Sequence, residues 1–82
     1  MDITTARVRD SIALVSVAGE LDLYNAAQLK EEAVRLFGKQ QQRMIFDLSE
    51  LSYVDSSGVG VLLYIYTGAQ KRGFDVVFSG VH

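Results

Sequence analysis

The chain has 82 residues, which allows one domain with a modest core. Its apolar content of 49%, its charges of both signs and its lack of proline are typical of a globular protein and not of a disordered one. The net charge of -2 and the scattered lysines and arginines argue against nucleic-acid binding, and the lack of cysteine excludes disulfides and thiolate metal sites. The only histidine is the last residue, His82, which leaves no basis for a histidine metal cluster or a catalytic triad.

The N-terminus lacks the charged-then-apolar pattern of a signal peptide. The longest apolar run, Val59–Tyr66, is too short to span a bilayer. We therefore expect a cytoplasmic protein.

The first elements predict a β-hairpin. Thr4–Arg9 alternates weakly between apolar and polar residues, and Asp10 and Ser11 are turn candidates. Ile12–Ala18 is rich in β-branched residues and is followed by Gly19. These two segments are expected to pair as antiparallel strands.

A helix is the next predicted element. Asn25 is a suitable N-cap, and Gln28 three residues later completes a capping-box arrangement. Gly38 is expected at the C′ position that ends the helix. The core-facing positions recur at helical spacing: Ala26, Leu29, Ala33 and Leu36 or Phe37.

The second half of the chain repeats the alternation of strand and helix. Gln40–Gln42 is expected as a loop, Arg43–Leu48 as a buried strand and Ser49–Val54 as a linker. A second helix is predicted over Ser57–Arg72, and a last strand over Phe74–Phe78.

The resulting order is β-β-α-β-α-β. Strands that alternate with helices indicate a parallel sheet with helices packed on it, and the N-terminal hairpin adds an antiparallel pair. We therefore predict a single α/β domain over residues 1–82, built on a small mixed sheet.

Several enzymatic and nucleotide-binding interpretations fail on residue type. Gly58 and Gly60 begin a G-x-G-x-x-G pattern, but Leu63 occupies the third glycine position, and no Gly-Lys-Ser/Thr follows as a phosphate-binding loop requires. A nucleophile elbow around Ser56 would need glycine in place of Val54 and a nearby base. We therefore expect no enzymatic activity and no cofactor.

The carboxylates allow two further hypotheses. Glu20 and Asp22 could form an acid–base pair, but a strand-end turn and a helix-entry charge are the favoured interpretation. Asp47, Glu50 and Asp55 could hold Mg²⁺, yet without a phosphate-binding loop they are expected as solvent-facing loop carboxylates, and no metal is predicted.

The serine pair at the start of the second helix carries the functional question. A hydroxyl at a helix N-terminus can cap the helix, act as a nucleophile or accept a phosphate, and the missing catalytic partners remove the nucleophile. Gly58 and Gly60 each cost about 1 kcal/mol relative to alanine in a helix, so we interpret them as clearance for a partner's active site. The helix is apolar almost all round, so some of its apolar side chains are expected to be exposed as a docking surface: Val59, Leu62, Tyr64 or Tyr66.

Three segments resemble the STAS domain of the anti-sigma-factor antagonist type. Gly19–Asp22 resembles the family's Gly-Glu-Leu/Ile-Asp, and Phe46–Val54 its central strand and loop. Asp55–Gly60 resembles its Asp-Ser-Ser/Thr/Ala-Gly-Leu/Val-Gly signature. The spacing agrees along nearly the whole chain.

The resemblance implies a partner-switching protein. Ser56 would be phosphorylated by an anti-sigma factor that is also a serine kinase, and a phosphatase would restore the unphosphorylated, binding-competent form. Asp55 would help to define the site, and Ser57 would cap the helix. The expected partner-binding residues are Asp22, Tyr24, Asp55, Ser57, Gly58, Val59, Gly60 and Leu62.

Two alternatives remain open. One is a STAS scaffold subunit of a signalling or lipid-transport complex, in which the serine is not phosphorylated. The other is a small nucleotide-binding domain that uses the Gly58–Gly60 turn.

The chain departs from the family at its C-terminal end. Family members usually continue past the last predicted strand with another helix and strand, whereas this sequence ends at Gly80–His82. The resemblance therefore implies a C-terminally short STAS-like domain with uncovered apolar sheet surface, and a homodimer is one expected consequence.

Overall fold

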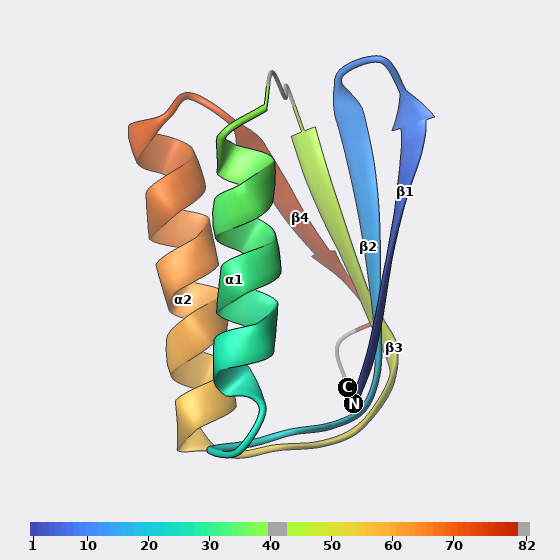
Figure 1. Cartoon of the computed structure of the whole chain (residues 1–82), viewed down its shortest axis with the longest axis vertical. Coiled ribbons are helices and arrows are strands. Elements are labelled where there is room, and N and C mark those ends of the chain that lie inside the picture. The colour runs from blue at the N-terminus through green and yellow to red at the C-terminus, as the bar shows by residue number, and fades with distance from the viewer. Residues whose placement is uncertain (40–42, 81–82) are drawn as a thin grey trace.

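The computed structural model of the chain describes residues 1–39 and 43–80 (Figure 1). Within them, four strands and two helices follow the predicted order β-β-α-β-α-β. The sheet order is β1-β2-β3-β4, with β1 antiparallel to β2 and the other neighbours parallel, which confirms the predicted fold class. The elements are β1 Asp2–Arg9, β2 Ile12–Leu21, α1 Ala26–Phe37, β3 Arg43–Val54, α2 Ser56–Lys71 and β4 Asp75–Ser79.

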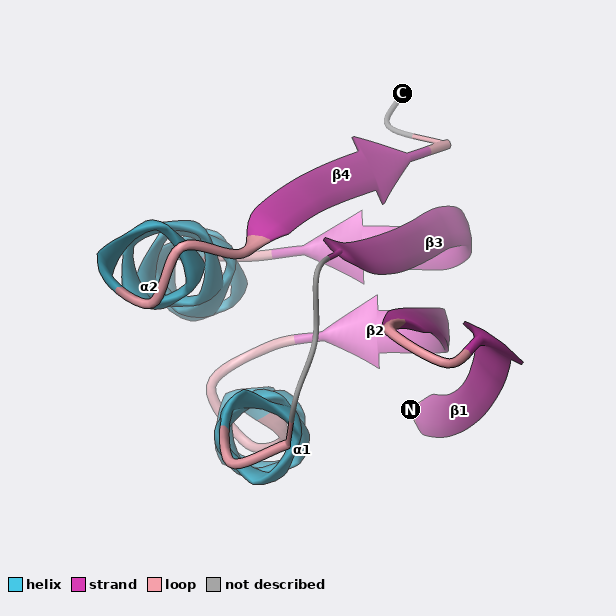
Figure 2. Ribbon diagram, turned by 90° about the horizontal axis from the view of Figure 1, so that it is seen from above, coloured by secondary structure: helices cyan, strands magenta, loops and turns pink. Residues whose placement is uncertain are grey.

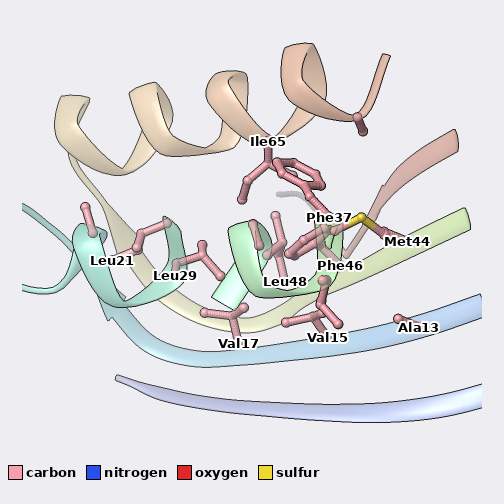
Figure 3. Close-up of a cluster of buried hydrophobic side chains, with 14 residues drawn as sticks. Ala13, Val15, Val17, Leu21, Leu29, Phe37, Met44, Phe46, Leu48 and Ile65 are labelled. Atoms are coloured by element: carbon pink, nitrogen blue, oxygen red, sulfur yellow. The ribbon is translucent and has the colours of Figure 1, made fainter. Parts of the chain in front are cut away.

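Both helices cover the same face of the sheet (Figure 2). Alternate residues of the two central strands point to that face, because successive side chains of a strand point to opposite sides. Val15 and Val17 of β2 and Phe46 of β3 are fully or almost fully buried there, against Leu29 of α1 and Ile65 of α2 (Figure 3). This two-layer core fixes the two helix starts relative to the sheet.

The helices pack against each other through a glycine. A Cβ atom on Gly68 of α2 would lie 2.9 Å from the ring of Phe37 in α1. The guanidinium of Arg72 lies over the Phe37 ring, 4.5 Å from its centroid, and donates a hydrogen bond to the Gly68 carbonyl oxygen. Neither helix in the described part of the chain is long and apolar enough to cross a membrane.

Three local predictions are wrong. The segment Ser49–Val54 is not a linker but the continuation of β3. Asn25 occupies the N-cap position of α1, but its side chain makes no capping hydrogen bond, so the predicted capping box with Gln28 is absent. Gly38 is the C-cap residue and has right-handed helical dihedrals (φ -76°), not the expected left-handed C′ conformation. The predicted loop at Gln40–Gln42 lies outside the described residues.

Candidate functional site

The site forms where two parallel strands end side by side. Leu21 of β2 is paired with Val54 of β3, and the backbone N–H of Asp55 donates to the Leu21 carbonyl oxygen at 3.1 Å. The loops that follow lead into α1 and α2 at the same end of the molecule, as Figure 1 shows at the bottom of the view. The β2–α1 loop and the start of α2 are therefore neighbours although they are far apart in sequence.

Asp55 is the N-cap of α2. Its backbone is extended (φ -96°, ψ -174°), and its Oδ1 accepts a hydrogen bond from the Gly58 N–H at 3.0 Å. Its Oδ2 accepts a second one from the N–H of Leu23, also at 3.0 Å. The prediction that Ser57 caps the helix is therefore wrong, because the residue before the serine pair satisfies the free amide of the first turn.

The capping by Asp55 leaves the serines free for another role. Ser56 is the first residue of α2 and its side chain is exposed, whereas Ser57 is half-buried. Within the described residues, neither hydroxyl takes part in a hydrogen bond. An exposed hydroxyl at a helix N-terminus is accessible to a reagent and lies where negative charge is tolerated.

The two glycines of the signature have different roles. Gly58 is buried, and a Cβ atom there would lie 2.8 Å from the Leu21 side chain, the Leu21 carbonyl oxygen and the Val54 side chain. The interpretation of Gly58 as clearance for a partner is wrong, because the space beside it is filled by Leu21 and Val54 at the strand ends of the domain itself. A Cβ on Gly60 would meet nothing within 4 Å, so this exposed position leaves the surface open beside α2.

Hydrogen bonds to side chains hold the β2–α1 loop in shape. Asp22 Oδ1 accepts from the Tyr24 N–H at 3.0 Å, and Asn25 Oδ1 accepts from the Asp22 N–H at 2.9 Å. The Asn25 amide group also donates to the Glu20 carbonyl oxygen at 2.7 Å. This arrangement supports the interpretation of Glu20 and Asp22 as a strand-end turn and a helix entry. It presents Tyr24 with 93% of its surface exposed.

Exposed apolar side chains lie on the β2–α1 loop and on the first turns of α2. Leu23 is 70% exposed, and Val59, predicted as part of a docking surface, is about half exposed. Leu62 is half-buried and lines a hollow of about 340 Å³ beside the α2 start. Leu23 and Tyr53 were not predicted as site residues. The signals in the sequence were that Leu23 directly follows Gly19–Asp22 and that Tyr53 lies within Phe46–Val54. The hollow is lined by Leu48, Leu51, Ser52, Tyr53, Val54, Val59, Leu62 and Gly80.

The edge that carries Ser56 is acidic. The segments 18–25 and 49–60 contain four carboxylates, Glu20, Asp22, Glu50 and Asp55, and neither lysine nor arginine. Asp47 and Glu50 lie on β3 and not in a loop, and the hydrogen bond from the Ser49 N–H lowers the pKa of Asp47. The described residues contain no group of three or more side chains that could hold a metal ion.

Comparisons with known proteins agree with this geometry. The family model described as the STAS domain matches residues 4–82. The anti-sigma-B factor antagonist of Listeria monocytogenes serovar 1/2a is 34% identical over 67 residues, and that of Bacillus subtilis is 37% identical over 59 residues. These matches cover 82% and 72% of this chain but 59% and 53% of the relatives, so the chain spans little more than half their length.

Solved structures show the same fold. The anti-sigma factor antagonist SpoIIAA in its unphosphorylated form matches with a TM-score of 0.80 at 20% identity, over 94% of this chain and 71% of that chain. The phosphorylated form of SpoIIAA from Bacillus matches with a TM-score of 0.77 at 21% identity, over 92% of this chain and 68% of that chain. The family match over nearly the whole sequence, together with this fold, shows that the chain belongs to the STAS-domain family.

Proposed function

We propose that this chain acts as an anti-sigma-factor antagonist whose binding is switched by phosphorylation of Ser56. The single observation that carries the proposal is the exposed Ser56 at the first position of α2, next to a cap that Asp55 already provides. Its relatives named anti-sigma-B factor antagonists support the family role.

The proposed role makes the chain a substrate and not a catalyst. Both oxygens of the Asp55 carboxylate accept backbone N–H groups, so the nearest carboxylate is engaged in holding the helix start. A kinase would supply the base, the metal ion and the ATP. The chain would supply an accessible hydroxyl on a rigid helix start.

Phosphorylation at this position would leave the fold intact and change the surface. A phosphoserine carries about -1.5 to -2 charges, and the N-terminus of a helix tolerates negative charge. The occurrence of this fold in unphosphorylated and phosphorylated SpoIIAA supports that expectation.

The switch would act through lost complementarity. The two segments that meet at Ser56, 18–25 and 49–60, combine exposed apolar side chains with four carboxylates and contain neither lysine nor arginine. A partner face that accepts a neutral hydroxyl there would have to desolvate an unpaired dianion after phosphorylation, which is costly. The anti-sigma kinase would therefore release the phosphorylated chain, and a phosphatase would restore binding.

The proposed partner surface combines both loops. It includes Asp22 and Tyr24 from the β2–α1 loop and Val59, Gly60 and Leu62 from α2, with Asp55 holding the two together. Gly58 is excluded as a contact because it is buried.

The test is incubation with ATP and a candidate anti-sigma factor of the serine-kinase type, followed by intact mass. We expect the wild type and the matched control Ser57→Ala to gain one phosphoryl group and Ser56→Ala to gain none. Full modification of Ser56→Ala would show that the assignment of Ser56 is wrong. If no such kinase modifies the wild type, the scaffold alternative is favoured instead.

A further inference from the structure

The Asp55 carboxylate joins two surface segments that lie far apart in the sequence. Asp55 accepts the Gly58 N–H through Oδ1 and the Leu23 N–H through Oδ2, both at 3.0 Å. The first bond caps α2. The second crosses to the β2–α1 loop, 32 residues earlier in the chain, and a helix cap does not require it.

The side chains of the Leu23–Tyr24 turn do not anchor it to the core. Its two side chains are 70% and 93% exposed, so packing against the core does not fix them. Within its own loop the turn is closed by hydrogen bonds from the Asn25 and Ala26 N–H groups to the Asp22 carbonyl oxygen, and the Asp22 carboxylate accepts the Tyr24 N–H. The Leu23 N–H instead donates to Asp55. Among the hydrogen bonds of the described residues, the bond to Asp55 is the one that joins the turn itself to the helix start that carries Ser56, next to the bond from the Asp55 N–H to Leu21 at the end of β2.

We propose that Asp55 is a positioning residue that holds the Leu23–Tyr24 turn at a fixed place beside Ser56, so that the protein partner meets turn and serine as one preformed surface. A surface that is ordered before binding avoids the entropic cost of ordering it in the complex. The partner part of this inference rests on the proposed function, whereas the hydrogen bond to the turn does not.

Asp55→Asn separates the two roles of Asp55. The amide oxygen of asparagine can still accept the Gly58 N–H, and asparagine is as good an N-cap as aspartate. The NH₂ group that replaces the second oxygen cannot accept the Leu23 N–H. Asp55→Ser is a second variant, because its single hydroxyl oxygen can cap the helix but cannot also accept the Leu23 N–H. Glu50→Gln is the matched control, because it removes a carboxylate from β3 that makes neither bond.

The first measurement is amide hydrogen exchange of the isolated chain by NMR. In Asp55→Asn we expect exchange at the Leu23 N–H to rise about tenfold while the Gly58 N–H stays protected, since a hydrogen bond to a charged group is lost at Leu23 alone. Glu50→Gln should leave both rates unchanged. Unchanged exchange at Leu23 in both Asp55 variants would overturn the proposal whatever the partner is.

The second measurement is a double-mutant cycle for binding to the anti-sigma kinase that phosphorylates the wild-type chain in the test above. Tyr24→Ala should weaken binding about tenfold in the wild-type background, as for an exposed aromatic anchor. In the Asp55→Asn background it should weaken binding less than about twofold, because the turn is no longer held in place. Equal losses in both backgrounds would show that the position of Tyr24 does not depend on Asp55.

The two measurements separate the two proposals. If no kinase binds or modifies the wild type, the proposed function fails, and hydrogen exchange still decides whether Asp55 positions the turn. If binding occurs but the mutational losses are additive, the proposed function stands and the positioning role fails.

Discussion

The two helices of this domain begin at the same edge of the sheet but are built differently. At the start of α1, the Asn25 side chain bonds backward, accepting from the Asp22 N–H and donating to the Glu20 carbonyl oxygen. At the start of α2, the Asp55 side chain bonds forward to the Gly58 N–H and sideways to the Leu23 N–H. Asn25 at the start of α1 therefore holds the shape of its own loop, whereas Asp55 at the start of α2 connects two segments of the chain.

The difference follows from the chemistry of the two side chains. An amide offers one acceptor and one donor group, so Asn25 can bridge an N–H and a carbonyl of the same turn. A carboxylate offers two acceptors, so Asp55 can collect N–H groups from two segments. The start of α2 can therefore present a serine at its first position without using the serine as a cap.

The largest expected effect tests how tightly α2 is seated. Gly58→Ala places a methyl group 2.8 Å from the Leu21 carbonyl oxygen and from two side chains, and the backbone atom cannot move aside easily. We expect the free energy of unfolding to fall by about 2 kcal/mol, as for an overpacked core. Gly60→Ala is the matched control in open space and should raise it by up to about 1 kcal/mol through helix propensity. Urea denaturation measures both, and equal effects would contradict the distinction between the glycines.

The second effect tests the assignment of donor and acceptor at the start of α1. Asn25→Asp keeps the acceptor for the Asp22 N–H but turns the donor to Glu20 into an oxygen facing a carbonyl oxygen. We expect a loss of about 1 kcal/mol in the free energy of unfolding, because one hydrogen bond is replaced by a repulsion. Chemical denaturation near neutral pH should show it. A stabilised variant would mean that the favourable charge at the helix N-terminus outweighs the loop bond.

The sequence predicted the fold because its apolar pattern is strong in the core strands. It missed the second half of β3, where the pairing with β2 shifts twice. Ser16 is paired with Asp47 but Ala18 with Glu50, and Gly19 is paired with Leu51 but Glu20 with Tyr53. Each shift adds one residue to β3, which breaks the alternation of period two that identifies a strand.

The sequence predicted the position of Ser56 but not the roles of its neighbours. Aspartate and serine are equally good N-caps, so residue preference could not choose between Asp55 and Ser57. In the structure Asp55 caps the helix and also accepts the Leu23 N–H, a contact from another loop that spacing along the chain does not reveal. Gly58 and Gly60 likewise look alike in sequence, and only Leu21 behind the helix distinguishes them.

A titratable side chain of helix α1, Glu32, contacts the sheet. α1 is also tied to the sheet by Glu32, which accepts hydrogen bonds from Arg35 and from the Thr5 hydroxyl of β1. The hydrogen bond from Arg35 is the main cause that lowers the pKa of Glu32 below its ordinary value of 4.5, with a smaller contribution from Thr5. A carboxyl whose pKa is lowered by folding stabilises the fold above its ordinary pKa, and this contribution is lost as pH falls through the folded value.

Glu32→Gln should therefore destabilise the chain by less than about 1 kcal/mol near pH 7, because solvent screens a pair whose arginine is half exposed. The difference from the wild type should shrink as pH falls below 4.5. Urea denaturation series at several pH values measure it. A gap that stays constant down to the acid transition would show that Glu32 acts through its shape and not through its charge.

The smallest expected effect is the most direct test of how α2 begins. Because Asp55 caps the helix, Ser57→Ala should change the free energy of unfolding by less than about 0.5 kcal/mol, and so should Ser56→Ala. A serine that acted as the cap would instead cost about 1 kcal/mol on replacement by alanine. Thermal and urea unfolding of both variants distinguish these outcomes. A loss of that size in Ser57→Ala alone would return the cap to Ser57, and Asp55 would then be left with the bond to the neighbouring loop as its main role.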